Sequence, residues 1–145
     1  MNRLERRICE LMAEIAPNLL ELAGCGGLTA AKIVGETADV SRFGSRGAYA
    51  MNNGTAPIPV WSGSRQRFRL NRGGNRQLNA AMHRSAVTQI RLNGSGPAYL
   101  ERRLAEGDTK TEALRALRRR ISDEVYRRLW QDHLSRSTRP AVAAA

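Results

Sequence analysis

The segment that decides the fold is Leu22-Ala23-Gly24-Cys25-Gly26-Gly27-Leu28-Thr29-Ala30, in which three glycines separate two short apolar runs. Glycine has no Cβ atom, so it ends helices and permits tight turns. Pro17 fits the first turn of a helix before these glycines, and residues 28–34 have the composition of a helix after them. Residues 17–37 are therefore predicted to form two short helices joined by a glycine turn.

This arrangement resembles the helix-hairpin-helix module of DNA-binding proteins. In that module, the turn glycines and the N-terminus of the second helix offer backbone N–H groups to a DNA phosphate without reading the bases. The resemblance makes Gly24, Gly26, Gly27 and Thr29 candidate nucleic-acid-binding residues. The alternative is a plain tight turn between two packed helices, and the sequence leaves both interpretations open.

Most of the remaining sequence also favours helices. Apolar residues recur at helical spacing in residues 4–15, 78–90 and 114–129. Residue types that cap or begin helices precede several of the expected elements. They are Ser45, Asn75, Pro97, and Thr109 with Glu112 as its capping-box partner.

The stretch from residue 52 to residue 74 is different, because Gly, Pro and Asn interrupt it repeatedly. Residues Ile58 to Trp61 and Arg67 to Leu70 are expected to form two short strands about the turn Ser62-Gly63-Ser64. The expected fold class is therefore mainly α: a helical domain with a helix-hairpin-helix module and a short irregular or β-hairpin loop around Ser62.

The predicted organisation is one domain with two flanking segments. Residues 1–16 are expected to be a linker helix, the end of an interdomain or coiled-coil helix, and residues 17–134 the domain itself. Residues 135–145 are expected to be a disordered tail. The apolar residues of the first helix either pack on this domain or contact another chain. They are Leu4, Ile8, Leu11 and Ile15.

The positive charge of the chain is concentrated in its middle. The formal net charge is +11, and from Val40 to Leu100 there are nine arginines and no Asp or Glu. A genome rich in guanine and cytosine also favours arginine, but it does not explain the missing acids. Contacts between basic side chains and phosphates supply most of the free energy of non-specific nucleic-acid binding. This arginine-rich stretch therefore indicates a polyanion partner. The candidate contacts are Arg65, Arg67, Arg69, Arg72, Asn75 and Arg76.

Other arginines and the cysteines give weaker signals. The arginines at 118–120, 127 and 128 are interpreted as a solvated helix face, with a second phosphate-binding track as the alternative. The two cysteines and two histidines have no metal-ligand spacing, so no metal site is expected. The chain has no apolar run of about 18 residues and no signal-peptide core, so no membrane partner and a cytoplasmic, nucleoid-associated location are expected.

Five motifs follow one another in a fixed order. They are the glycine turn, the connector Asp39 to Phe43, the step Ala56-Pro57, the pair Ser62-Gly63, and the helix start Arg72-Gly73-Gly74-Asn75-Arg76-Gln77-Leu78. With these motifs, residues 15–92 resemble the C-terminal domain of transposases of the insertion sequence one-hundred-ten, one-hundred-sixteen and nine-hundred-two family, relatives of the Piv and MooV DNA invertases. The last third of the chain matches only as generic helix.

The resemblance implies DNA transposition by site-specific recombination. In this family a RuvC-like N-terminal domain supplies metal-binding carboxylates and the C-terminal domain, here residues 17–134, supplies a serine. Ser62 falls on that serine position and is the candidate catalytic residue. The resemblance further implies that Mg²⁺ belongs to the N-terminal domain, with no cofactor in this chain, and that a guide RNA is a partner beside DNA.

By the same resemblance, the chain is expected to begin at about the helix that joins the two domains of the family, as either a truncated reading frame or a separately made half. It is expected to bind DNA without recombining it alone, because residues 40–100 hold no carboxylate that could serve as base or metal ligand. One alternative is a non-catalytic helix-hairpin-helix protein that binds DNA or RNA. Another is a non-functional relic, or a regulator that docks on full-length transposase, or self-associates, through the N-terminal helix.

Overall fold

The computed structural model describes residues 1–69 and 71–139, without the side chains of residues 65 and 67. This part of the chain forms seven α-helices, one short 3-10 helix and one antiparallel pair of strands, so the expected mainly α fold is confirmed. The elements are α1 (Arg3–Ile15), α2 (Pro17–Leu20), α3 (Gly27–Thr37), η1 (Val40–Arg42), α4 (Arg46–Asn53), β1 (Ile58–Ser62), β2 (Arg65–Arg69), α5 (Arg76–Arg91), α6 (Ser95–Ala105) and α7 (Lys110–Thr138).

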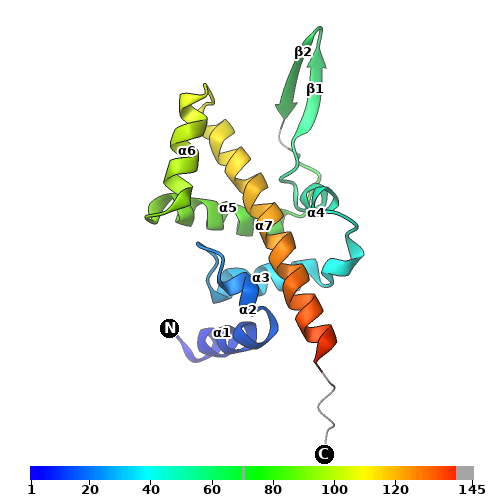
Figure 1. Ribbon diagram of the computed structural model, residues 1–145, viewed down its shortest axis with the longest axis vertical. Coiled ribbons are helices and arrows are strands. Elements are labelled where there is room, and N and C mark those ends of the chain that lie inside the picture. Colours follow the sequence, from blue (N-terminus) through cyan, green and yellow to red (C-terminus); the bar gives the residue numbers. More distant parts are fainter. Residues whose placement is uncertain (70, 140–145) are drawn as a thin grey trace, which may run out of the picture.

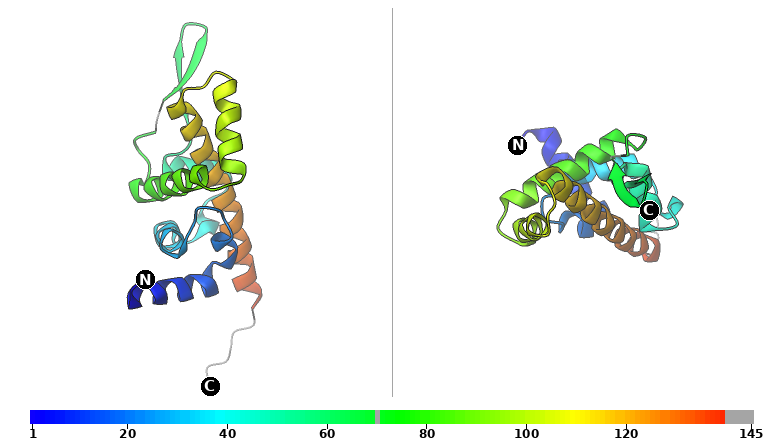
Figure 2. Two further views of the ribbon diagram at one scale, coloured as in Figure 1. Left: turned by 90° about the vertical axis from the view of Figure 1, so that its left-hand side faces the viewer. Right: turned by 90° about the horizontal axis from the view of Figure 1, so that it is seen from above.

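The long helix α7 organises the molecule, because α2, α4, α5 and α6 all pack against it. Figure 1 shows α1, α2 and α3 near the C-terminal end of α7, whereas the β1–β2 hairpin extends beyond the helices at the other end. The side view in Figure 2 gives the same separation. Between these ends lies one apolar core, whose largest buried side chains are Tyr49, Leu19, Ile33, Leu78, Met82 and Val125.

The caps expected at Ser45, Asn75 and Thr109 are present, whereas α6 begins at Ser95, two residues before the expected start at Pro97. The Asn75 Oδ1 atom accepts hydrogen bonds from the backbone N–H groups of Gln77 and Leu78, at 2.9 and 3.0 Å. Thr109 and Glu112 form the reciprocal capping box at the start of α7. Each cap satisfies N–H groups that have no partner inside the helix, which fixes where α5 and α7 begin.

The first helix packs inside this chain. Met12 is buried, and Ile8, Leu11 and Ile15 are partly buried against the core, mainly beside α3. Leu4 lies outside this contact and is 69% exposed. Most of the apolar stripe of α1 is therefore used within the domain.

The last helix is longer than expected. Residues 135–138 belong to α7, so the predicted start of a disordered tail at residue 135 is wrong. The guanidinium of Arg136 donates a hydrogen bond to the backbone carbonyl of Ile15, which ties the last turns of α7 to the end of α1. The expected strand residue Leu70 and residues 140–145 of the expected tail lie outside the described residues.

Candidate nucleic-acid interface

The hairpin around Ser62 is formed by two five-residue strands. The strands extend nearer to the turn than expected, because Ser62 ends β1 and Arg65 begins β2. The turn itself is therefore Gly63-Ser64 rather than Ser62-Gly63-Ser64. Gly63 has a φ of +62°, and a glycine with positive φ at the first central position is what a type II′ hairpin turn requires. The hairpin form of the expected loop is confirmed.

The register of the hairpin gives it two different faces. Ser62 pairs with Arg65, Val60 with Arg67 and Ile58 with Arg69. Because successive residues of a strand alternate between faces, these six positions share one face of the hairpin. The opposite face is made by the remaining pairs, which are Trp61 with Gln66 and Pro59 with Phe68. Ser62 thus stands at the end of a basic face, and two aromatic residues stand on the other.

Both faces are accessible. The hairpin extends away from the helices (Figures 1 and 2). Ser62 is exposed, and so are Arg69 in the same strand pair and Arg72 after it. On the opposite face, Trp61 is 67% and Phe68 58% exposed. A serine hydroxyl in this position can be reached by a phosphate of a large polyanion.

The base of the hairpin is held by a close backbone contact. A Cβ atom on Gly74 would lie 2.4 Å from the backbone nitrogen of Gly54 and 2.5 Å from its Cα atom. Nearby, the backbone N–H of Asn75 donates to the carbonyl of Asn52 at 2.6 Å. The chain therefore leaves α4 and returns to α5 at one point, which requires glycine at position 74.

Asn75 serves this base with all of its polar groups. Its side-chain carbonyl caps α5, and its side-chain Nδ2 donates to the Glu36 carboxylate at 3.0 Å. The motif before the helix, which was expected from the sequence to contact nucleic acid, thus makes internal contacts at Gly74 and Asn75. Arg72 and Arg76 on either side of it are exposed.

Alanine at position 74 should destabilise the fold, because the new Cβ atom would meet backbone atoms that cannot move away easily. We expect Gly74→Ala to lower the free energy of unfolding by about 2 kcal/mol or more. Gly73→Ala is the matched control, since its Cβ atom would meet only the Asn71 side chain, at 3.4 Å. Chemical denaturation monitored by circular dichroism measures both, and equal losses in the two variants would contradict the close-contact explanation.

Close packing explains some of the glycines in the turn between α2 and α3. A Cβ atom on Gly24 would lie 2.5 Å from the carbonyl oxygen of Ser85, and one on Gly27 would lie 2.4 Å from the sulfur of Cys9. Thr29 is only 7% exposed. Gly26 is exposed, and a Cβ atom on it would meet nothing within 4 Å. Packing therefore explains Gly24 and Gly27, and Gly26 is the position where a phosphate could approach.

The turn glycines and the hairpin arginines are not brought together. Glu36, near the end of α3, contacts Asn75 at the hairpin base. Because an α-helix rises 1.5 Å per residue, the beginning of α3 at Gly27 lies about 14 Å from that contact. The molecule thus offers two separate candidate surfaces rather than one continuous site.

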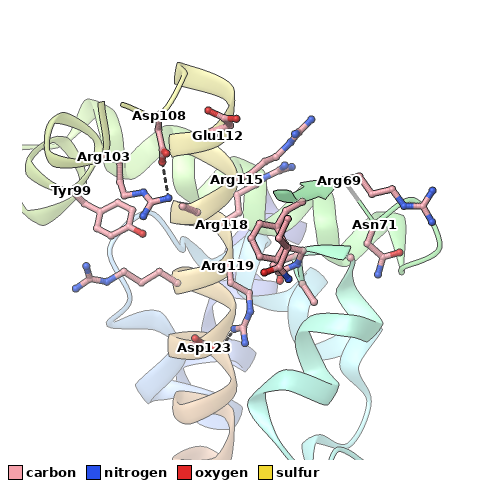
Figure 3. Close-up of a pocket in the computed structure, with 18 residues that line it drawn as sticks. Arg69, Asn71, Tyr99, Arg103, Asp108, Glu112, Arg115, Arg118, Arg119 and Asp123 are labelled. Atoms are coloured by element: carbon pink, nitrogen blue, oxygen red, sulfur yellow. Dashed lines mark hydrogen bonds and ion pairs between the residues drawn. The ribbon is translucent and has the colours of Figure 1, made fainter. Parts of the chain in front are cut away.

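A groove that was not expected from the sequence lies between the hairpin base and α7. Its volume is about 920 Å³, and Figure 3 shows Arg69 and Asn71 on one side of it and Arg115, Arg118 and Arg119 of α7 on the other. The sequence shows that arginines recur at helical spacing in α7. It does not show that these arginines lie opposite the hairpin base, because the hairpin and α7 are brought together only by the tertiary fold.

Neither a metal-binding cluster nor a membrane-spanning helix occurs in the described residues. They contain no group of three or more His, Cys, Asp or Glu residues placed to hold a metal ion. Among the same residues, no helix is long and apolar enough to cross a membrane. Cys9 and Cys25 are free thiols.

Comparison with known proteins identifies the group to which the sequence belongs. The profile described as the transposase IS116/IS110/IS902 family matches residues 16–101. The chain belongs to this family. The resemblance drawn from the ordered motifs is thereby confirmed, and the matched range includes Ser62, the hairpin base and the glycine turn.

Three relatives in this transposase family are similar over most of the chain. The insertion element IS110 uncharacterized 43.6 kDa protein of Streptomyces coelicolor is 36% identical over 74% of this chain. The IS900 42 kDa protein of Mycobacterium paratuberculosis is 31% identical over 88%, and the IS116 44.8 kDa protein of Streptomyces clavuligerus is 29% identical over 86%. The aligned regions cover 27%, 32% and 31% of these relatives, so the chain spans about a third of their length.

Proposed function

We propose that this chain is the C-terminal, DNA-binding part of a transposase and that Ser62 is its nucleophile in site-specific recombination. The observation that carries the proposal is the exposed Ser62 opposite Arg65 in an acid-free hairpin, inside the region that matches the family. A hydroxyl at the tip of a projecting basic hairpin can approach a DNA phosphate without steric hindrance from the helices.

In the proposed reaction, the Ser62 Oγ atom forms a bond to the phosphorus of a DNA phosphodiester. A deoxyribose oxygen leaves and takes up a proton to become a free hydroxyl, while the serine proton passes to a base, so the step consumes no net proton. A hydroxyl of the partner DNA strand then attacks the serine phosphodiester and releases Ser62. Each step exchanges one P–O bond for another, so recombination needs no external energy source.

The arginines of the hairpin would stabilise the charge of this reaction. The pentacoordinate transition state carries negative charge on its non-bridging oxygens, and guanidinium groups close to it lower its energy. Positions 65, 67 and 69 share the strand face of Ser62, which supports this role for them. Arg72 and Arg76, on either side of the motif that follows the hairpin, would add further phosphate contacts to this basic surface.

The metal chemistry of the reaction would come from other residues. Mg²⁺ sites are built from clustered carboxylates. The described residues contain no such cluster, so they do not fit a Mg²⁺ site. We place the metal ligands and the base in the RuvC-like domain that the family resemblance implies. The proposed partners are accordingly DNA, that domain and a guide RNA, in the bacterial cytoplasm.

The DNA-binding part of the proposal is tested by charge. Replacing Arg67 and Arg69 together by glutamine should weaken binding to every DNA sequence. It should also reduce the slope of log Kd against log salt by about 2, since each phosphate contact contributes roughly 0.9. Fluorescence anisotropy with labelled duplexes over a series of salt concentrations measures both quantities.

The control removes the same charge elsewhere. Arg84 and Arg91 are exposed on α5, away from the hairpin, and their double glutamine variant should leave most of the salt slope intact. If the two double variants behaved alike, the binding surface would be the net charge of the whole chain and the hairpin would have no special part.

A second candidate function is phosphate binding by the helix-hairpin-helix turn without catalysis. One observation favours it: Gly26 precedes α3 in an extended conformation, and no side chain caps that helix. The first N–H groups of α3 could therefore bind a phosphate. Gly26→Glu should abolish DNA binding if this surface dominates, whereas under the hairpin proposal it should cost less than the loss of Arg67 and Arg69.

The third candidate, docking on full-length transposase or on a second copy, would use the exposed part of α1. Leu4 is the exposed apolar residue that supports it. Leu4→Glu should then prevent association measured by analytical ultracentrifugation, without lowering the affinity for DNA.

A further inference from the structure

The groove between the hairpin and α7 has two chemically different walls. Gln66 and Phe68 contribute to the hairpin wall, and Phe68 belongs to the aromatic face of the strands. The opposite wall is α7, which contributes the arginines at 115, 118, 119 and 120. Figure 3 shows the labelled α7 side chains at 115, 118 and 119 facing the segment that carries Arg69 and Asn71.

The charge of the groove is positive. Its described lining residues include six arginines and three acidic residues, which gives a net charge of +3. Two of the acidic residues are already neutralised, because Asp108 pairs with Arg103 and Asp123 pairs with Arg119. An anion entering the groove therefore meets uncompensated arginines.

Among the groove arginines, Arg118 most clearly has an unused hydrogen-bond donor. Its Nη1 atom donates to the Asn79 side chain at 3.3 Å, and its buried Nε has no hydrogen-bond partner within residues 1–69 and 71–139. Burial, and to a smaller extent the neighbouring Arg115, lowers the pKa of the Arg118 guanidinium. A phosphate beside the two arginines would accept the unused donor and offset their repulsion.

The aromatic groups of the groove suit flat ligands. Phe68 is 58% exposed although it is a large apolar side chain. Across the groove, the Arg120 guanidinium lies over the Tyr99 ring, 5.0 Å from its centroid. An exposed ring beside a row of cations is the arrangement with which proteins bind unpaired nucleic-acid strands, because bases stack on rings while cations contact the phosphates.

We infer that this groove binds an unpaired DNA strand, with a base stacked on Phe68 and its phosphates along Arg115, Arg118 and Arg120. A paired duplex keeps its base faces stacked inside the helix and cannot offer them to Phe68. The inference rests on the proposed function, since Ser62 and Phe68 lie on opposite faces of one hairpin. The hairpin would stand between the phosphate attacked at one face and the separated strand held at the other.

Binding of a single strand and a duplex of the same sequence tests the inference by fluorescence anisotropy. Phe68→Ala should weaken single-strand binding about ten-fold, since one stacked base contributes about that factor. Duplex binding should change less than about two-fold, and Phe68→Tyr should restore single-strand binding. Arg115→Gln with Arg118→Gln should produce a similar loss for the single strand.

Two matched variants control for general effects. Leu92→Ala removes an exposed apolar side chain outside the groove, and Arg84→Gln removes an exposed arginine of α5. In a Trp130→Phe background, Trp61 is the remaining tryptophan. Because Trp61 shares the strand face of Phe68, its fluorescence should be quenched by the single strand and not by the duplex.

Unchanged single-strand binding in Phe68→Ala would overturn the inference, as would an equal loss of single-strand and duplex binding in that variant. Equal or tighter binding of an RNA strand of the same sequence would overturn the assignment to DNA. These failures are distinct from failure of the proposed function, which predicts duplex binding that depends on Arg67 and Arg69. If the double glutamine variant of Arg67 and Arg69 kept its affinity for the duplex, the proposed function would be contradicted, whatever happens to single-strand binding.

Discussion

Alanine at position 62 is expected to abolish DNA strand exchange while the affinity for DNA changes less than about two-fold. Removing a nucleophile typically lowers the rate of an enzyme by a factor of about 10³ or more, because no other group can form the covalent intermediate. The Ser62 side chain is exposed, so its removal leaves the core unchanged. The measurement is recombination of supercoiled plasmid DNA with a RuvC-like domain of the family supplied in trans.

The neighbouring serine gives the matched control. Ser64 is an exposed hydroxyl in the turn, two residues from Ser62, and Ser64→Ala should retain most of the activity. A covalent complex of protein and DNA that survives denaturation should form with Ser64→Ala and not with Ser62→Ala. Recombination by Ser62→Ala at an unchanged rate would remove the serine from the mechanism and leave the hairpin as a binding element.

Loss of Asp132 is expected to be the largest destabilisation by a single side chain. Asp132 is 1% exposed. Its carboxylate accepts the backbone N–H of Asn18 at 3.0 Å, the side-chain amide of Asn18 at 2.8 Å and the backbone N–H of Leu19 at 3.2 Å. In Asp132→Ala these donors lose their acceptor inside the protein, so the free energy of unfolding should fall by about 3 kcal/mol.

Thermal unfolding measured by circular dichroism would show this as a decrease in Tm of about 10 °C for a chain of this size. Asp132→Asn, which keeps one acceptor oxygen, should fall between Asp132→Ala and the unaltered chain. Glu10→Ala removes an exposed carboxylate that pairs with Arg7 and should change stability by less than about 1 kcal/mol. A similar Tm for the three variants would mean that α2 is held by its apolar contacts alone.

Features that depend on neighbouring residues could be predicted from the sequence. Local signals were sufficient for the caps at Asn75 and Thr109 and for the buried face of α5, because a cap or a helical stripe involves residues within a few positions of one another. The hairpin was also local, since its strands are adjacent in sequence. Its register nevertheless corrected the turn by including Ser62 in β1.

Long-range contacts could not be inferred. Asp132 reads as one more polar residue on an arginine-rich helix, and its role depends on α2, more than a hundred residues away. Asn75 reads as a motif residue facing a ligand, and its side chain is used between α5 and Glu36. The groove likewise depends on α7 meeting the hairpin. In each case one residue type allows several partners, and only tertiary packing selects among them.

The paired strands of the hairpin impose a parity rule on its length. Each residue pair added to the strands moves the tip outward by about 3.4 Å and turns the side chain at the tip to the opposite face of the hairpin. A relative with one extra pair between the base at Gly74 and the turn would present its serine on the aromatic side, and a relative with two extra pairs would present it among the arginines again. The reach of the serine should therefore vary among related transposases in steps of about 7 Å, while the helices beneath it stay the same.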